Sequence, residues 1–215
     1  MDDEDWAQRS QANLTPITVG HITVAPPWFV HEAVGGPQPP SAGITITILP
    51  SMGFGTGHHA TTRLCLAALQ RIDVGGKTVL DVGTGSGVLA IAAATLGARE
   101  ARGIDFDPDA IANARENLTL NQGVGHVRFD VADLREASIA RADIVLANLT
   151  GAVLVQNAAR LSSAVIPGGA LILSGLQTHE RDQVGQAFAG AALAWSEEEA
   201  GWVAMLFNLP VHREV

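Results

Sequence analysis

Short apolar runs recur along the chain from residue 79 onward, and the segments between them have the apolar spacing of helices. The runs lie at 79–82, 101–105, 125–129, 142–148 and 170–175. Strands that alternate with helices in this way are typical of a parallel sheet covered by helices. Two further runs, 192–195 and 202–207, predict an antiparallel pair at one edge. We therefore expect a Rossmann-like, doubly wound α/β fold with a mostly parallel seven-stranded sheet.

The first fifty residues follow a different pattern, rich in threonine, proline and glycine. The expected elements are a short helix over 6–13, a β-hairpin around Gly20-His21 and a half-buried strand over 44–48. This pattern predicts a small N-terminal β appendage. We expect a linker-like segment over residues 1–50 and a ligand-binding domain over residues 51–215.

Length and charge limit the classes of function. The chain has 215 residues and a formal net charge of −9, which argues against binding bare nucleic acid and permits a basic protein partner. No apolar run approaches the length of a membrane span, and the N-terminus is acidic rather than signal-like. We therefore expect a cytoplasmic protein that does not bind membranes. Cys65, the single cysteine, is expected to be a buried free thiol.

The stretch from Val79 to Gly87 carries the main chemical signal. An apolar run ends in glycines at 83, 85 and 87, and a helix-like segment follows. Glycines allow a sharp turn and a close approach of the backbone to a ligand, and the free N–H groups of the next helix point at the same place. This order predicts a site for a nucleotide-type ligand.

The spacing around these glycines favours a cationic ligand. Dinucleotide sites use G-x-G-x-x-G, whereas this loop has G-x-G-x-G with Asp81 two residues ahead of it. A carboxylate at that point repels a pyrophosphate and suits S-adenosylmethionine, which carries an ammonium and a sulfonium. Asp105 ends the next apolar run, where an acid can accept hydrogen bonds from both ribose hydroxyls.

The segment from Met52 to Thr62 predicts a loop that folds over a small ligand, because glycines, Phe54 and paired threonines precede an apolar helix. We expect Phe54 to cover the cofactor and Thr62 to contact it, and either Thr61 or Thr62 can also cap the helix. The adjacent histidines lack a third ligand nearby, so we expect no metal site.

Two polar residues follow later strands. Asn148 ends the run 142–148, and ligands of open α/β sheets bind at the carboxyl ends of strands. Its side-chain carbonyl could accept hydrogen bonds from an acceptor amine, although a turn asparagine is the alternative. Asp133 follows the run 125–129 and is either an adenine contact or a helix cap.

Together these residues resemble the bacterial PrmA family of ribosomal-protein methyltransferases, which are class I methyltransferases. The residues that carry the resemblance are Phe54-Gly55-Thr56-Gly57, His59, Thr61-Thr62, Asp81 to Ala92, Gly103-Ile104-Asp105, Asp107-Pro108 and Ala147-Asn148-Leu149. The resemblance implies transfer of methyl groups from S-adenosylmethionine to amino groups of large-subunit ribosomal protein eleven. It also implies that an acid after the third strand, here Asp133, contacts the adenine amino group.

The chain departs from the family pattern at several positions. The usual threonine and proline beside the loop histidine are His58 and Ala60, and the acid before Pro50 is Leu49. The chain begins in what resembles the family's linker, so we expect the N-terminal substrate-recognition domain to be missing from it. The acceptor is then the same ribosomal protein, another protein or a small amine.

The expected mechanism needs positioning more than acid or base chemistry. The three glycines cradle the methionine part, Asp81 helps hold its ammonium, Asp105 takes the ribose and Asn148 orients the acceptor amine. No residue stands out as a general base, and His59 is a weak candidate. The alternatives are a small-molecule methyltransferase, an oxidoreductase of the same fold or a nucleotide-binding module without catalysis.

Overall fold

The computed structural model describes residues 15–31, 43–49, 59–136 and 139–211. The expected helix over residues 6–13 lies outside these ranges. Seven strands form one sheet in the order β6-β5-β4-β7-β8-β10-β9. The strands are β4 Thr78–Val82, β5 Glu100–Asp105, β6 Val127–Val131, β7 Ala142–Asn148, β8 Val165–Gln177, β9 Ala192–Glu199 and β10 Trp202–Asn208.

The predicted topology is confirmed. Strands β4 to β8 pair in parallel, whereas β10 is antiparallel to both β8 and β9. The order of the strands reverses between β4, from which the chain moves outward to β5, and β7 on its other side. Ligands of doubly wound sheets bind at such a reversal, beside the carboxyl ends of the strands.

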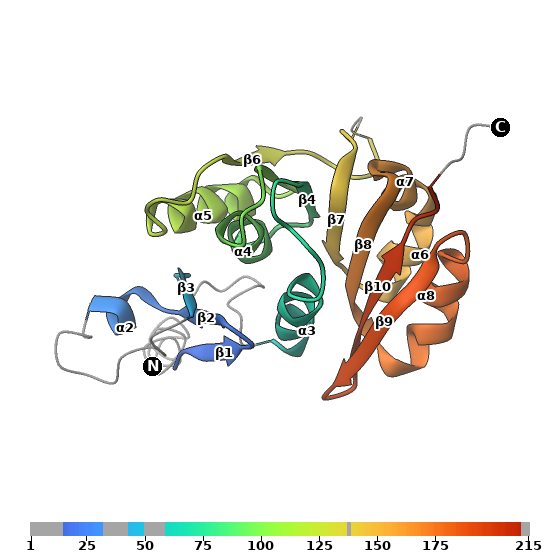
Figure 1. Cartoon of the computed structure of the whole chain (residues 1–215), viewed down its shortest axis with the longest axis horizontal. Coiled ribbons are helices and arrows are strands. Elements are labelled where there is room, and N and C mark those ends of the chain that lie inside the picture. The colour runs from blue at the N-terminus through green and yellow to red at the C-terminus, as the bar shows by residue number, and fades with distance from the viewer. Residues whose placement is uncertain (1–14, 32–42, 50–58, 137–138, 212–215) are drawn as a thin grey trace, which may run out of the picture.

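Helices cover both faces of the sheet (Figure 1). On one face lie α3 Ala60–Leu69, α4 Val88–Thr95 and α5 Pro108–Thr119; on the other lie α6 Gly151–Gln156, α7 Ala158–Ala164 and α8 Arg181–Ala187, the last preceded by the 3-10 helix η1 Thr178–Glu180. Alternate residues of each central strand face one layer or the other, which gives two apolar cores. We refer to the two sides as the α3 face and the α6 face.

The N-terminal part forms its own three-stranded sheet from β1 Ile17–Val19, β2 Ile22–Ala25 and β3 Ile44–Thr47. β1 and β2 make the predicted antiparallel hairpin, and β3 pairs with β2 in parallel. A short helix, α2 Pro27–His31, was not expected from the sequence. The fully buried Ile22 and Ile46 join the core of the α3 face, so the small sheet packs directly on the larger unit.

The structure contradicts three local predictions that the sequence makes. The apolar pattern predicts one helix over 153–161 and a turn at 167–169, but the helix is broken at Asn157 into α6 and α7, and residues 167–169 belong to the long strand β8. The helix predicted from residue 108 to about residue 121 should turn its asparagines to solvent, but Asn117 is fully buried and Asn121, just after the end of α5, is nearly so. They form hydrogen bonds to main-chain atoms of other elements, which apolar periodicity cannot reveal.

No helix in the described part of the chain is both long and apolar enough to cross a bilayer.

Candidate functional site

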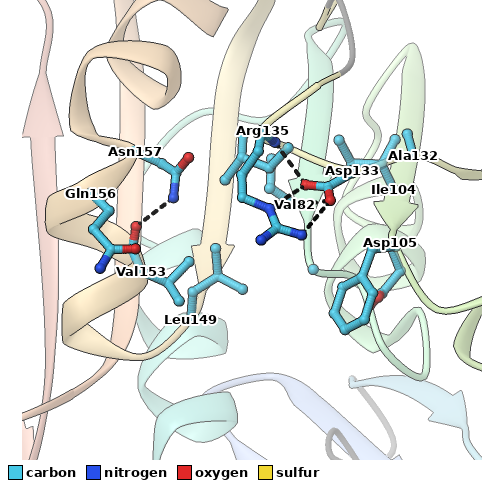
Figure 2. Close-up of a pocket in the computed structure, with 13 residues that line it drawn as sticks. Val82, Ile104, Asp105, Ala132, Asp133, Arg135, Leu149, Val153, Gln156 and Asn157 are labelled. Carbon is cyan, nitrogen blue, oxygen red and sulfur yellow. Dashed lines mark hydrogen bonds and ion pairs between the residues drawn. The ribbon is translucent and has the colours of Figure 1, made fainter.

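A cavity of about 300 Å³ opens at the carboxyl ends of β4, β5, β6 and β7. Figure 2 shows it between α6 and the loops that follow β5 and β6. Its lining combines apolar side chains with two acids, Asp105 and Asp133, and with Gly83 of the glycine loop. The structure therefore brings together three of the residues predicted for the cofactor site.

The glycine turn has the predicted form. Gly83, Gly85 and Gly87 all have positive φ, at 70°, 52° and 81°. A Cβ at Gly83 would lie 2.5 Å from Leu149 Cδ2, and one at Gly87 would lie 2.7 Å from Phe129 Cζ. Both glycines are therefore required by backbone conformation and by close packing. Gly87 is the N-cap of α4, so the free N–H groups of that helix face the loop.

Asp105 is held in place by the loops on both sides of it. Its Oδ2 accepts a hydrogen bond from the backbone N–H of Gly85 at 3.0 Å, and its Oδ1 accepts one from the N–H of Asp107 at 3.1 Å. The residue is only 9% exposed, and it lines the cavity. Each oxygen keeps a further lone pair, so the carboxylate can still accept two hydroxyl hydrogens.

Asp81 lies below the glycine loop and is almost completely buried. Its Oδ2 accepts a hydrogen bond from Thr84 Oγ1 at 2.6 Å, whereas its Oδ1 has no partner among the described residues. Burial raises the pKa of Asp81 to about 7; the Thr84 hydrogen bond and the backbone N–H of Ala90 in the first turn of α4 oppose this rise, and the charge of Asp105 adds to it. An unpaired carboxylate oxygen beside a second acid fits a cationic group, which would relieve both the burial cost and the repulsion.

Asp133 already has a partner in the loop after β6. Arg135 donates from Nε to both carboxylate oxygens and from Nη2 to Oδ2 at 2.6 Å, and its backbone N–H donates to Oδ1 at 2.8 Å. These hydrogen bonds lower the pKa of Asp133 to about 2. In Figure 2 the Arg135 side chain extends between Asp133 and Leu149. Asp133 therefore both lines the cavity and caps a local turn, since the described residues directly after it, 134–136, form a turn and not a helix.

Asn148 does not line this cavity. It ends β7, is half-buried and pairs in register with Ser174 of β8. Because Asp81 pairs in register with Leu146, two residues before Asn148, both polar side chains lie on the α3 face. Cys65 of α3 lies on the same face as a buried free thiol; burial and then the Asp81 charge raise its pKa well above the usual range.

The start of α3 differs from the prediction in its cap. The N-cap residue is His59, whose Nδ1 accepts a hydrogen bond from the Thr61 N–H, so neither threonine takes the capping role that the sequence left open for them. The His59 ring packs edge-on against Trp202, with centroids 4.9 Å apart. Thr62 is buried in the first turn, and Phe54 lies outside the described residues. The contacts expected of both with a cofactor stay predictions.

Several residues of the site were not found from the sequence. Phe106 lines the cavity and is 72% exposed, and Arg135, Leu149 and Asn157 also line it. Phe106 carried a usable signal, because an exposed aromatic directly follows the acid that ends β5. The role of Thr84 could also have been suspected, since it is the hydroxyl residue between the first two glycines.

Within the described ranges, no three histidine, cysteine, aspartate or glutamate side chains gather closely enough to hold a metal ion.

The fold and this arrangement of acids around a glycine turn are those of Rossmann-like methyltransferases. A solved structure of an RNA methyltransferase from Salinibacter ruber, in complex with S-adenosyl-L-homocysteine, shares the fold with a TM-score of 0.57 and 23% identity; the match covers 70% of this chain and 92% of that one. A crystal structure described as ribosomal protein L11 methylase from Lactobacillus delbrueckii subsp. bulgaricus matches with a TM-score of 0.81 and 26% identity, over 92% of this chain and 100% of that one.

The chain belongs to the family described as ribosomal protein L11 methyltransferase (PrmA), whose sequence pattern matches residues 1–209. A curated relative from Streptococcus equi subsp. zooepidemicus, named ribosomal protein L11 methyltransferase, is 38% identical over 209 residues. That alignment covers 96% of this chain and 64% of the relative, so the chain spans somewhat less than two thirds of the relative's length. The resemblance seen in the sequence is confirmed.

Proposed function

We propose that this protein is a cytoplasmic protein N-methyltransferase that uses S-adenosylmethionine and acts on a ribosomal protein of the L11 type. Family membership and the names of the relatives support the acceptor. The division into a linker-like segment over 1–50 and a cofactor-binding domain over 51–215 is part of the same proposal. The separate three-stranded sheet supports that division.

One observation carries the cofactor assignment: Asp81 and Asp105 flank the glycine turn, and Asp81 is buried with one oxygen that has no partner in the part of the chain that the structure describes. A pyrophosphate would place negative charge beside this pair, which costs free energy, whereas an ammonium would neutralise it. Asp105 has free lone pairs for a ribose, and Phe106 offers an exposed ring at the cavity for a base. The residues present therefore fit S-adenosylmethionine better than a dinucleotide.

We assign roles to the predicted residues on this basis. Gly83, Gly85 and Gly87 leave room for the methionine part, and Asp81 supplies negative charge below it. Asp105 binds the ribose, and Asp133 accepts from the adenine amino group while it stays ionised beside Arg135. Phe54 and Thr62 complete the cofactor contacts.

When bound, S-adenosylmethionine would supply a methyl group on a positively charged sulfur. The task of the protein is then to hold a neutral amine in line with that group and to exclude water. Asn148 fits the positioning role, because its side-chain oxygen can accept a hydrogen from the amine and direct the lone pair. It ends β7 on the same face of the sheet as Asp81, the acid that we propose would hold the ammonium of the cofactor.

Transfer of radiolabelled methyl from S-adenosylmethionine into a cell extract tests the proposal. One labelled protein with the mass of L11, absent with Asn148→Ala, is the expected result. Label found only in small molecules would indicate a small-molecule methyltransferase. No label despite tight cofactor binding would indicate a binding module, and binding of NADH alone would indicate an oxidoreductase.

A further inference from the structure

Two buried asparagines, Asn117 on α5 and Asn121 just after its end, bind main-chain atoms of segments distant in the sequence. Asn117 is 0% exposed and Asn121 is 8% exposed. Their partners lie on the chain at and just after β3, which Figure 1 shows beneath α4 and α5. A buried amide costs free energy unless it is hydrogen-bonded, so these contacts define where the chain can lie.

Asn121 holds the end of β3 as a neighbouring strand would. Its Oδ1 accepts from the Thr47 N–H at 2.8 Å, and its Nδ2 donates to the Thr47 carbonyl at 2.8 Å. The same Nδ2 donates to the carbonyl of Asn117 at 2.7 Å. None of these partners belongs to the glycine loop.

Asn117 joins two different segments through one side chain. Its Oδ1 accepts from the Leu49 N–H at 2.8 Å, and its Nδ2 donates to the Ser86 carbonyl at 2.9 Å and to Asn113 Oδ1 at 3.1 Å. Ser86 lies between Gly85, whose N–H binds Asp105, and Gly87, which begins α4. A single buried amide thus connects the chain that leaves β3 to the turn that shapes the cofactor site.

We propose that Asn117 is a positioning residue that couples the glycine loop to the segment after β3, so that occupation of the cofactor site and seating of the N-terminal sheet reinforce each other. The inference rests on the proposed cofactor site. A ligand that holds the glycine loop in place also holds the Ser86 carbonyl in place. The Asn117 side-chain amide that donates to this carbonyl is then fixed in orientation, and its oxygen is the acceptor for the Leu49 N–H. Coupling of this kind is reciprocal, so release of Leu49 weakens ligand binding by the same factor.

Asn121 supplies a matched control. Asn117→Asp keeps an oxygen for the Leu49 N–H but replaces the donor to Ser86 with an oxygen that repels the carbonyl. Asn121→Asp makes the same change one helical turn further on, and it breaks bonds only to Thr47 and to α5 itself. Both variants bury a carboxylate at similar depth, so a merely structural role predicts similar effects.

The experiment measures S-adenosylhomocysteine affinity by calorimetry and hydrogen exchange of the Leu49 amide with and without that ligand. In the wild type the ligand should slow hydrogen exchange at the Leu49 amide. The factor by which it slows should be about tenfold larger than the factor for the Val184 amide in α8, which serves as a distant reference. Asn117→Asp should lose this excess and weaken binding about tenfold, the effect of one lost buried hydrogen bond. Asn121→Asp should keep the excess and change affinity by less than about twofold. If a buried carboxylate unfolds either protein, the pair Asn117→Ala and Asn121→Ala replaces it.

Equal losses of affinity in the two variants, or no excess slowing at Leu49 in a wild type that binds, would overturn the coupling and leave the proposed function intact. A wild type that does not bind S-adenosylhomocysteine would overturn the proposed function, and the coupling with it.

Discussion

Two acids near the carboxyl ends of the strands, Asp81 and Asp133, have opposite electrostatic environments. On the α3 face Asp81 is buried, lacks a partner for Oδ1 within the described chain, and has a raised pKa of about 7. In the cavity on the α6 face, Asp133 is paired with Arg135 and has a lowered pKa of about 2. The first arrangement has negative charge left to neutralise, whereas the second is neutralised already. The difference supports our proposal that the cationic end of the ligand binds beside Asp81 and a neutral ring binds near Asp133.

The largest effect on cofactor affinity is expected from removing the negative charge of Asp81. Asp81→Asn should weaken S-adenosylmethionine binding at least about thirtyfold, because truncating one partner of a buried charged contact costs about 2–5 kcal/mol. The same variant should be no less stable than the wild type at pH 8, because the cost of burying a charge disappears. Calorimetry and urea unfolding measure the two effects. Retained affinity would remove Asp81 from the site.

A smaller loss is expected at the other acid of the loop. Asp105→Ala should weaken cofactor binding by about 1 to 3 kcal/mol, the cost of leaving polar partners unpaired. Titration of the variant with S-adenosylmethionine measures this change, and Asp107→Ala, at the exposed cap of α5, is the control for a local change of charge. An unchanged dissociation constant in Asp105→Ala would exclude the ribose contact.

The raised pKa of Asp81 predicts a pH dependence with a definite sign. The folded protein holds an extra proton between about pH 4 and pH 7, so the free energy of unfolding should fall as pH rises through that window. Ligand affinity should change the other way and rise up to about tenfold from pH 6 to pH 8, as the carboxylate ionises. Asp81→Asn should flatten both profiles. An affinity profile identical in variant and wild type would assign the dependence to another group.

The smallest effect is expected from breaking the ion pair between Asp133 and Arg135. Arg135 is 73% exposed, so Arg135→Ala should change cofactor affinity by less than about fivefold, because exposed ion pairs contribute little. Its direction should be towards tighter binding, since Asp133 is then free for the adenine amino group. Arg128→Ala, which breaks an exposed pair with Glu100 away from the cavity, is the matched control. A loss of more than tenfold in Arg135→Ala alone would mean that the arginine itself contacts the ligand.

The succession of strands along the chain and the glycine turn could be predicted because both leave local signals. These signals are apolar runs of strand length, and glycines where φ is positive. The ion pair between Asp133 and Arg135 could not be predicted, because the sequence does not show which of the acids at the site has a partner. The buried roles of Asn117 and Asn121 also escaped prediction. Their spacing of four residues is typical of the polar face of a helix, and only the position of β3 shows that these side chains are covered.

Binding of cofactor fragments tests whether Asp81 interacts with the cationic end of the ligand. Calorimetry would compare S-adenosylhomocysteine with 5′-methylthioadenosine, which has the adenosine part but no ammonium, on the wild type and on Asp81→Asn. The wild type should strongly prefer S-adenosylhomocysteine, and the variant should lose this preference while it binds 5′-methylthioadenosine as the wild type does. A variant that keeps the full preference, or a wild type that shows none, would contradict this interaction.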